Sequence, residues 1–417
     1  MAKKEAAKKK GYVCPYCFTK VDMTKIHYVC TGPSCAKEFA KQAVSTKDEK
    51  KLLYVSKDGQ NEIDREKSLV FGKDPFGPDA IIAKQHIIRD SSGFCDICKR
   101  PAYLRVCPTC HNMIPMGAEE EGNKIFVILG PKGVGKSHYI AVLINQLKNT
   151  ICTEFNGVLS AANDNTTIRY RDVYYHRLFE EKRKLQPTLS FGSSDNSREP
   201  LIFYLRILKD DKPQVFTFAF FDTAGEDLVS TNRMMSLNLN AFISLASGIV
   251  FLVDPMQVKY INQRIHVDNK PEIGPSPTDI LSNVCQIIRN NNKIKGKDRI
   301  DIPIAVSLTK SDVLFKIPEN EEESKVLIGL NSALHIPRER GKYDEENFDQ
   351  IDAELEEYLR RTIGPEFISV VNSFKDHSLF AVSALGCNPT GNALPRAVSP
   401  LRVEDPFLWL LNKEGLR

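Results

Sequence analysis

The segment GPKGVGKS at residues 130–137 constrains the fold of this 417-residue chain more than any other part of its sequence. It fits the pattern G-x-x-x-x-G-K-[ST], follows an apolar run at 125–129 and precedes an amphipathic stretch at 138–149. In such a strand–loop–helix unit, glycines let backbone N–H groups surround a phosphate at the helix N-terminus. The sequence therefore predicts an α/β domain that binds a nucleoside phosphate. Its expected phosphate-binding residues are Gly130, Pro131, Lys132, Gly133, Val134, Gly135, Lys136, Ser137 and His138.

From residue 124 onward, short apolar runs alternate with longer polar or amphipathic segments. The runs lie at 125–129, 201–208, 215–221, 248–253, 302–308 and 379–382. Short strands separated by helix-length segments predict a mainly parallel sheet with helices on both faces. The short link KDDKPQ between the second and third runs predicts one antiparallel edge pair. We expect residues 124–417 to form this domain, with insertions near 150–200 and 317–365.

Three further motifs follow predicted strands, in the order DTAGED at 222–227, TKSD at 309–312 and SAL at 383–385. All of them stand at the carboxyl ends of strands, where open α/β sheets bind ligands. Together with the glycine-rich segment, they resemble the guanine-nucleotide-binding domain of Ras-like P-loop GTPases, from residue 124 to about residue 415. The resemblance implies GTP or GDP as the ligand, Mg²⁺ as a cofactor, and a GTP-hydrolysing molecular switch as the function.

On the phosphate side, the resemblance assigns Lys136 to the β- and γ-phosphates and Ser137 to magnesium. Asp222 would hold magnesium through a water molecule. The N–H of Gly225 would contact the γ-phosphate and move the second switch.

The first-switch threonine, a further expected magnesium ligand, is not marked by a sharp motif. We assign it to Thr188, because this residue lies between an amphipathic stretch and the strand predicted near residue 201. Thr166 and Thr167 fit the start of a helix better.

On the base side, a carboxylate is needed because guanine offers two donors, N1 and the 2-amino group. The resemblance gives this role to Asp312, packs Lys310 along the base, and assigns the N–H of Ala384 to guanine O6. The same two loops contribute Thr309, Ser383 and Leu385.

Glu226, which follows DTAG, departs from the pattern, because many Ras-like enzymes have a water-positioning glutamine there. Its charge adjoins the developing anionic phosphoryl group, so we expect slow intrinsic hydrolysis. The alternative function is a non-hydrolysing, nucleotide-bound adaptor. A compensating cation could come from Arg233, from Arg198 or from a partner, and such a cation contributes about 10³–10⁵ in rate.

Eight of the eleven cysteines form two closely spaced quartets near the N-terminus. Two short Cys-x-x-Cys-type turns can close a tetrahedron around zinc, and a closed four-thiolate site is structural because no position stays open for water. The spacing resembles zinc ribbons, so we expect one at 11–40 and another at 91–118, with His27 and His111 as substitute ligands. The expected quartets are Cys14, Cys17, Cys30 and Cys35, then Cys95, Cys98, Cys107 and Cys110.

The formal net charge of +4 averages two unlike parts of the chain. Residues 1–118 carry 21 basic and 13 acidic side chains, whereas residues 119–417 carry 36 and 40. The basic part comprises a tail at 1–10, the two cysteine modules and a mixed connecting region at 41–90. Such a charge suits nucleic acid, but charge alone is a weak argument, and a protein partner for residues 1–118 is the preferred interpretation.

The chain contains no apolar segment near the roughly 20 residues that a membrane span needs. Its basic N-terminus is followed by no apolar stretch typical of a secretion signal. We therefore expect a cytoplasmic protein with reduced thiols.

The four-cysteine modules, the long insertions and DTAGED together resemble bacterial proteins of the double-GTPase type. This resemblance implies a protein partner, in particular a second GTPase, and a role in biological conflict or phage defence. A ribosome- or RNA-associated GTPase is a further alternative.

Overall fold

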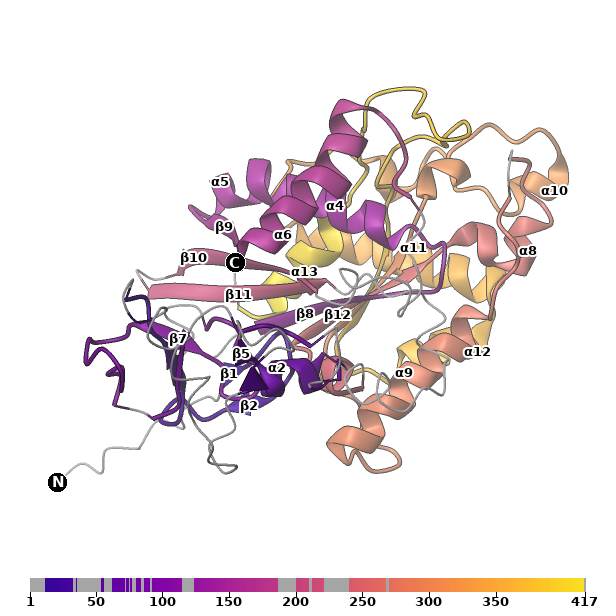
Figure 1. Cartoon of the computed structure of the whole chain (residues 1–417). Coiled ribbons are helices and arrows are strands. Elements are labelled where there is room, and N and C mark those ends of the chain that lie inside the picture. The colour runs from indigo at the N-terminus through magenta and orange to yellow at the C-terminus, as the bar shows by residue number, and fades with distance from the viewer. Residues whose placement is uncertain are drawn as a thin grey trace. The chain divides into compact units, whose positions relative to one another are not determined.

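The fold of the chain is given by a computed structural model (Figure 1). It describes residues 12–32, 35, 54–55, 62–71, 73–74, 76, 80–83, 86–90, 92–114, 124–186, 200–209, 212–220, 240–267 and 270–415. The chain divides into two compact units, Met1–Asn123 and Lys124–Arg417, and each unit is described by itself.

The second unit is built on a seven-stranded sheet of order β14-β13-β12-β8-β11-β10-β9. Its strands are β8 (Lys124–Leu129), β9 (Val158–Ala161), β10 (Leu201–Lys209), β11 (Lys212–Phe220), β12 (Gly248–Val253), β13 (Ile304–Leu308) and β14 (His377–Ala381). The strands from β14 to β11 run parallel, whereas β10 is antiparallel to both of its neighbours. The expected mainly parallel sheet is therefore confirmed. Strands β10 and β11 form the expected antiparallel pair, but this pair does not lie at the edge of the sheet, because β9 pairs with β10.

Strand β9 is an edge strand that the sequence analysis missed. It is four residues long and pairs with β10, so that Leu159 lies opposite Leu205. Its residues alternate between exposed and half-buried positions and form no apolar run. A short edge strand of this kind gives only a weak sequence signal, because one side of its backbone meets no other strand.

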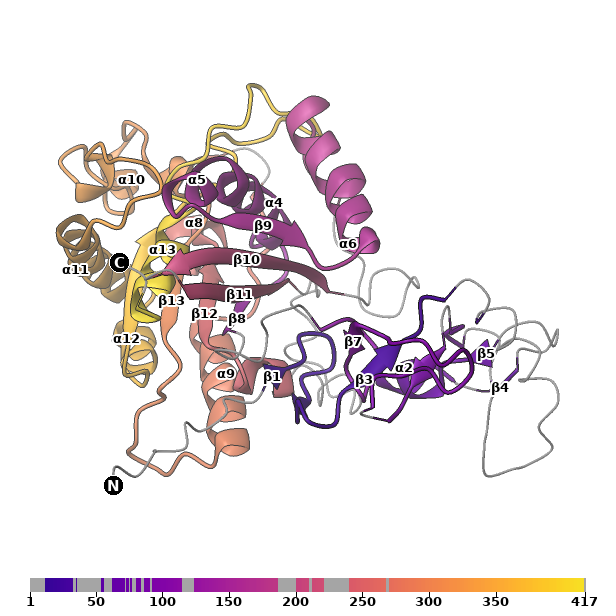
Figure 2. The same cartoon turned by 90° about the vertical axis from the view of Figure 1, so that its left-hand side faces the viewer.

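Helices cover both faces of the sheet, as expected (Figures 1 and 2). On one face, side chains of β8, β11 and the helices α4 and α13 share one core that contains Phe126, Tyr139, Phe218 and Phe407. Figures 1 and 2 place α9 and α12 on the opposite face. The helices are α4 (Lys136–Gln146), α5 (Cys152–Glu154), α6 (Asp164–Arg169), α8 (Lys259–Asn262), α9 (Pro277–Asn292), α10 (Glu321–Ser324), α11 (Glu345–Thr362), α12 (Pro365–Val371) and α13 (Asp405–Lys413). Wider π-helical turns form η1 (Leu147–Ile151) and η2 (Tyr170–Glu180), and 3₁₀ turns form η5 (Pro255–Gln257), η6 (Ser311–Leu314) and η7 (Ala333–His335).

Polar side chains begin several of these helices where the sequence suggests it. The Asn163 side chain accepts a hydrogen bond from the N–H of Thr166 at 2.7 Å, so Thr166 stands at the start of α6, as expected. The Asp344 carboxylate accepts a bond from the N–H of Asn347 in the same way at the start of α11. Such caps satisfy amide groups that the first helical turn leaves unpaired.

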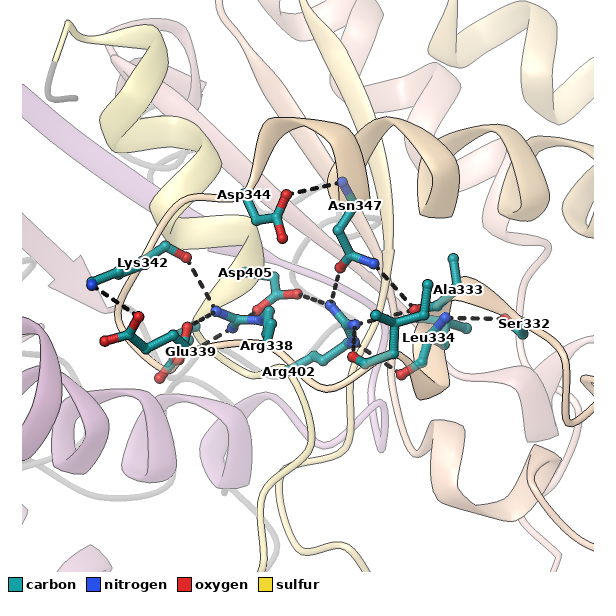
Figure 3. Close-up of polar contacts among 12 residues, drawn as sticks. Ser332, Ala333, Leu334, Arg338, Glu339, Lys342, Asp344, Asn347, Arg402 and Asp405 are labelled. Atoms are coloured by element: carbon teal, nitrogen blue, oxygen red, sulfur yellow. Dashed lines mark hydrogen bonds and ion pairs between the residues drawn. The ribbon is translucent and has the colours of Figure 1, made fainter.

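A buried ion-pair network fastens the segment before α11 to the start of α13 (Figure 3). Arg402 donates to Asp405 at 2.9 Å and to Asn347 Oδ1 at 2.9 Å, and Arg338 pairs with Glu404 at 3.1 Å and with Asp405. Burial raises the pKa of the Asp405 carboxyl to about 6, although both arginines oppose this shift. Arg402 also donates to three backbone carbonyls, those of Ala333, Leu334 and Ile336.

The first unit consists of short strands and one described helix, α2 (Arg65–Val70). Its strands are β1 (Tyr12–Val13), β2 (Lys20–Val21), β3 (His27–Val29), β4 (Tyr54–Val55), β5 (Glu62–Ile63), β6 (Ile87–Ile88) and β7 (Leu104–Val106). Strand β3 pairs with both β6 and β7, which come from the far end of the unit. The two cysteine-bearing segments therefore share one small sheet.

Candidate functional site

The glycine-rich segment lies between β8 and α4, at the carboxyl edge of the sheet. Gly133 and Gly135 have φ values of +77° and +90°, which L side chains rarely adopt, and a Cβ on Gly130 would lie 3.1 Å from the carbonyl oxygen of Leu252. The sequence needs glycine at these positions because the loop turns tightly and approaches β12 closely. The loop ends at the N-terminus of α4, where amide groups and the helix dipole favour an anion.

A cavity of about 440 Å³ lies at this edge and brings together three of the sequence motifs. The glycine-rich loop lines this cavity, and so do Lys310 and Asp312 together with Ser383, Ala384 and Leu385. Pro131, Lys132, Val134, Lys136, Ser137 and His138 line the same cavity. Thr309 stands beneath them, and its hydroxyl donates to the carbonyls of Val134 at 2.9 Å and Val253 at 3.2 Å.

Lys310 contacts the glycine-rich loop. Its Nζ donates to the carbonyl oxygen of Gly133 at 3.0 Å and pairs with Asp254 at 2.5 Å. Its Cε lies 3.8 Å from the position that a Cβ on Gly135 would occupy. The side chain thus fixes the loop and presents its aliphatic part to the cavity.

Asp312 is held beside the loop that carries Ala384. Burial raises the pKa of the Asp312 carboxyl, and the hydroxyl of Ser383 together with the charges of Arg396 and Lys310 opposes this shift. Ser383 itself is buried and accepts a hydrogen bond from the N–H of Gly386 at 2.9 Å. Asp312 therefore has groups around it that favour its ionised form inside a poorly solvated site.

Two residues at this site, Asp254 and Gln257, were missed by the sequence analysis. The Asp254 carboxylate is buried, and its second oxygen accepts a bond from the N–H of Met256 at 2.9 Å. Gln257 Nε2 donates to the carbonyl oxygen of Lys132 at 2.7 Å. The sequence does contain a signal for Asp254, because this residue directly follows the apolar run of β12. Polar residues at the carboxyl ends of strands lie at the edge of the sheet where ligands bind.

His138, the last residue of the predicted phosphate-binding set, contacts another part of the chain. Its Nε2 accepts a hydrogen bond from the N–H of Leu185 at 3.1 Å. Leu185 lies three positions before Thr188. The phosphate-loop helix therefore holds the segment that leads toward the expected first switch.

Several expected site residues lie outside the described residues. These are Thr188, Arg198, Asp222, Gly225, Glu226 and Arg233. Of the expected magnesium ligands, the structure therefore describes Ser137 alone.

The eight N-terminal cysteines form two four-thiol groups, but the expected grouping was wrong. One group is Cys14, Cys17, Cys107 and Cys110, and the other is Cys30, Cys35, Cys95 and Cys98. Each group thus takes two thiols from each predicted ribbon. The reason is the antiparallel pairing of β3 with β7, which sets His27 opposite Val106 and Val29 opposite Leu104. Cys30 and Cys107 follow these strands, so they emerge at opposite ends of the pair.

Both groups have the geometry of zinc sites. The closest Sγ–Sγ distances are 3.6 Å for Cys14–Cys110 and Cys17–Cys107, 3.5 Å for Cys30–Cys98 and 3.4 Å for Cys35–Cys95. A zinc tetrahedron with Zn–S bonds of about 2.3 Å has sulfur–sulfur edges of about 3.8 Å. His27 and His111 belong to neither four-thiol group. His111 Nδ1 instead lies 2.9 Å from a carboxylate oxygen of Asp64.

This sheet order, the glycine-rich loop on β8 and the TKSD and SAL loops on β13 and β14 define a P-loop GTPase domain. A cysteine-rich unit suited to zinc precedes it. The family model Double-GTPase 2 matches residues 124–379, and the chain belongs to this family.

Two further similarities were found. The chain is 29% identical over 329 residues to the "Putative ESX-1 scaffolding and assembly protein SaeC" of Mycolicibacterium smegmatis, a match that covers 75% of this chain and 80% of that protein. Among solved structures, the Arl6 (BBS3) small GTPase of Trypanosoma brucei with bound GppNp matches with a TM-score of 0.27 and 11% identity. That match covers 70% of this chain and 96% of the small GTPase. Within the described residues, no helix is both long and apolar enough to span a membrane.

Proposed function

We propose that this protein is a magnesium-dependent molecular switch that binds and hydrolyses GTP. The observation that carries the proposal is the convergence of the glycine-rich loop, Lys310 with Asp312, and the loop of Ala384 on one cavity of about 440 Å³. The GTPase family to which the chain belongs supports the same activity.

In this proposal, the loop amides and Lys136 bind the β- and γ-phosphates, and Ser137 with Asp222 and Thr188 hold magnesium. Magnesium, when bound, neutralises charge on the phosphate oxygens. Ordering of the segments around Thr188 and Gly225 by the γ-phosphate, and their release after hydrolysis, would make the site a switch.

Base selection is assigned to the two loops beyond the phosphate end. Asp312 accepts hydrogen bonds from N1 and the 2-amino group of guanine, and the N–H of Ala384 donates to O6. Adenine reverses this donor and acceptor pattern, so an ionised Asp312 selects against it. The half-buried position of Asp312 strengthens the selection, because a carboxylate that is poorly solvated and unpaired is costly.

We further propose that the cysteine-rich unit holds two structural zinc ions and engages a protein partner. The two four-thiol groups support the metal assignment, and the similarity to SaeC, a putative scaffolding and assembly protein, supports a protein partner. A second GTPase and a bacterial defence system are the partner and setting that the double-GTPase resemblance suggests. Nucleic-acid binding by residues 1–118 is the competing proposal, and it predicts salt-dependent RNA or DNA binding that is lost on their deletion.

Equilibrium binding of GDP, GTP and ATP to the purified full chain tests the nucleotide assignment. We expect a marked preference for guanine nucleotides, its loss in Asp312→Ala, and loss of all nucleotide binding in Lys136→Ala. Equal affinity for ATP and GTP in the wild-type protein would refute the guanine assignment.

Phosphate release separates the switch from the non-hydrolysing adaptor. We expect slow turnover of GTP by the wild-type protein and faster turnover by Glu226→Gln, because glutamine positions water without adding negative charge. Absence of turnover in both proteins, with and without candidate partners, would favour the adaptor.

A further inference from the structure

The loop that carries Ala384 is held by a later part of the same chain, which we call the return strap and define as residues 386–401. Ser383 and Leu401 exchange two backbone hydrogen bonds of 2.9 and 2.8 Å, and the N–H of Ser399 donates to the carbonyl oxygen of Leu385 at 3.0 Å. The strap therefore pairs with all but the central residue of the SAL motif. Among the backbone hydrogen bonds of the described residues, none uses the N–H of Ala384, so this group can bind a base.

Gly386 shows how closely the strap packs against this loop. Its φ is +70°, and a Cβ at this position would lie 2.0 Å from the carbonyl oxygen of Ser399. Its N–H donates to Ser383 Oγ at 2.9 Å, and its carbonyl oxygen accepts a hydrogen bond from Nη2 of Arg396. The side chains of Ser383 and Arg396 thus bind both polar backbone groups of Gly386.

We infer that Arg396 is a positioning residue for guanine recognition, which it serves by fixing the Gly386 carbonyl and by placing a positive charge near Asp312. This inference rests on the proposed GTP-binding function. Arg396 suits both tasks, because a guanidinium group donates hydrogen bonds in fixed directions and carries a positive charge.

The electrostatic part of the inference concerns the protonation of Asp312. Guanine binding needs the carboxylate, whereas burial raises the pKa of Asp312 and so favours the neutral acid. Ser383, Arg396 and Lys310 oppose this effect. Lys310 is already paired with Asp254, so loss of the Arg396 charge leaves Asp312 with less compensation. The other titratable side chains that line the cavity are Lys132, Lys136, His138, Tyr139, Lys184 and Cys387.

The sign of the pH effect follows from the pKa. As the pH falls through the pKa of Asp312, the protein loses its carboxylate and GDP affinity decreases. Removal of the Arg396 charge raises that pKa further, so the decrease begins at a higher pH. ADP makes no hydrogen bond to the Asp312 carboxylate, so protonation of Asp312 does not lower ADP affinity, and a parallel loss of GDP and ADP affinity reports changes at the other titrating groups.

The test measures the affinities of GDP and ADP between pH 5 and pH 8 for the full-length wild type, Arg396→Gln, Arg396→Lys and Arg360→Gln. Arg360 is an exposed arginine of α11 that pairs with Glu356, and it serves as the matched control. We expect Arg396→Gln to lower GDP affinity at pH 6 about tenfold, with a smaller loss at pH 8 and no loss of ADP affinity. Arg396→Lys should restore the pH profile of GDP affinity, because it restores the positive charge. At pH 8, the GDP affinity of this variant should recover only in part.

Three outcomes separate the possible failures. A wild-type protein that binds GDP no better than ADP refutes the proposed function itself. A wild-type protein that prefers GDP, with an unchanged affinity and pH profile in Arg396→Gln, overturns only the role of Arg396. An equal loss of GDP and ADP affinity in Arg396→Gln also overturns it, since this result indicates general damage to the loop.

Discussion

The Nζ atom of Lys310 lies 2.5 Å from Oδ2 of Asp254, a carboxylate whose side chain is fully buried. The same Nζ donates to the carbonyl oxygen of Gly133 at 3.0 Å. The pair therefore ties together the loops after β12 and β13 and the glycine-rich loop after β8. Because the second oxygen of Asp254 accepts the N–H of Met256, the carboxylate also shapes the turn that carries Gln257.

Asp254→Ala should weaken both the fold and the nucleotide site. The change leaves the Met256 N–H without its acceptor and the Lys310 ammonium group with the Gly133 carbonyl but no carboxylate, at a cost of about 1–3 kcal/mol in the free energy of unfolding. We expect GDP affinity to fall about tenfold as Lys310 loses its orientation. Calorimetric titration with GDP checks this value, with the exposed Asp349→Ala of α11 as the control. Equal losses in both variants would contradict the proposed role.

His138→Ala should reduce the preference for GTP over GDP. The substitution removes the acceptor for the N–H of Leu185 and frees the segment that leads to Thr188. A net loss of one hydrogen bond, about 1 kcal/mol, corresponds to about fivefold in affinity. We expect this loss for a non-hydrolysable GTP analogue and a smaller one for GDP. His138→Gln retains an acceptor, so it should recover part of the ratio of GTP-analogue affinity to GDP affinity. An unchanged ratio in both variants would contradict the proposed link between His138 and the segment that leads to Thr188.

The crossed grouping of cysteines is tested by two reciprocal double variants. Cys17→Ser with Cys107→Ser damages one four-thiol group twice, so one zinc ion per chain should be retained. Cys14→Ser with Cys30→Ser damages both groups, so both ions should be lost or strongly weakened. Elemental analysis of the purified proteins gives the metal content.

Two separate ribbons would give the opposite result in each case. Under that grouping, the first double variant loses both ions and the second keeps one. Because each variant carries two Cys→Ser changes, a general effect of thiol loss cannot produce the predicted difference.

Arg402→Ala should strongly destabilise the second unit. The change leaves Asp405 buried beside a single arginine and removes the donor to three carbonyls (Figure 3). Removal of one partner from a buried ion pair costs about 3–5 kcal/mol. Urea unfolding followed by the fluorescence of Trp409 measures this, since it is the single tryptophan of the chain and is buried in α13.

Arg360→Ala is the control for this measurement. Arg360 pairs with Glu356 one helical turn away, and both side chains are exposed. An exposed pair of this kind contributes about 0.3–0.5 kcal/mol. If Arg402→Ala lowers the free energy of unfolding as little as Arg360→Ala does, the buried network does not hold the insertion near 317–365 to α13.

The core of the nucleotide site was predictable because its signals are local. Gly133 and Gly135 are required by backbone geometry within a few residues, and Asp312 lies in the short TKSD motif that follows the buried strand β13. The carboxyl ends of parallel strands meet at one edge of a sheet, so three motifs far apart in sequence could be expected in one cavity.

Asp254 and Arg396 were harder to recognise, because their importance depends on contacts with distant residues. Asp254 meets Lys310 across 56 positions, and Arg396 acts on Gly386 only because the return strap folds back on itself. Strand β9 was missed for a related reason, since a short edge strand is defined by its pairing with β10 more than by its own composition.

By itself, the sequence determined the α/β class, the phosphate loop and the presence of eight metal-type thiols, because each depends on residue type and short-range spacing. Only the tertiary structure decided which thiols share a group. Spacing places Cys14 and Cys17 near Cys30, but the pairing of β3 with β7 carries Cys30 toward Cys98 and leaves Cys107 for Cys17. Backbone hydrogen bonds between distant segments set that arrangement, and short-range spacing contains no information about their register.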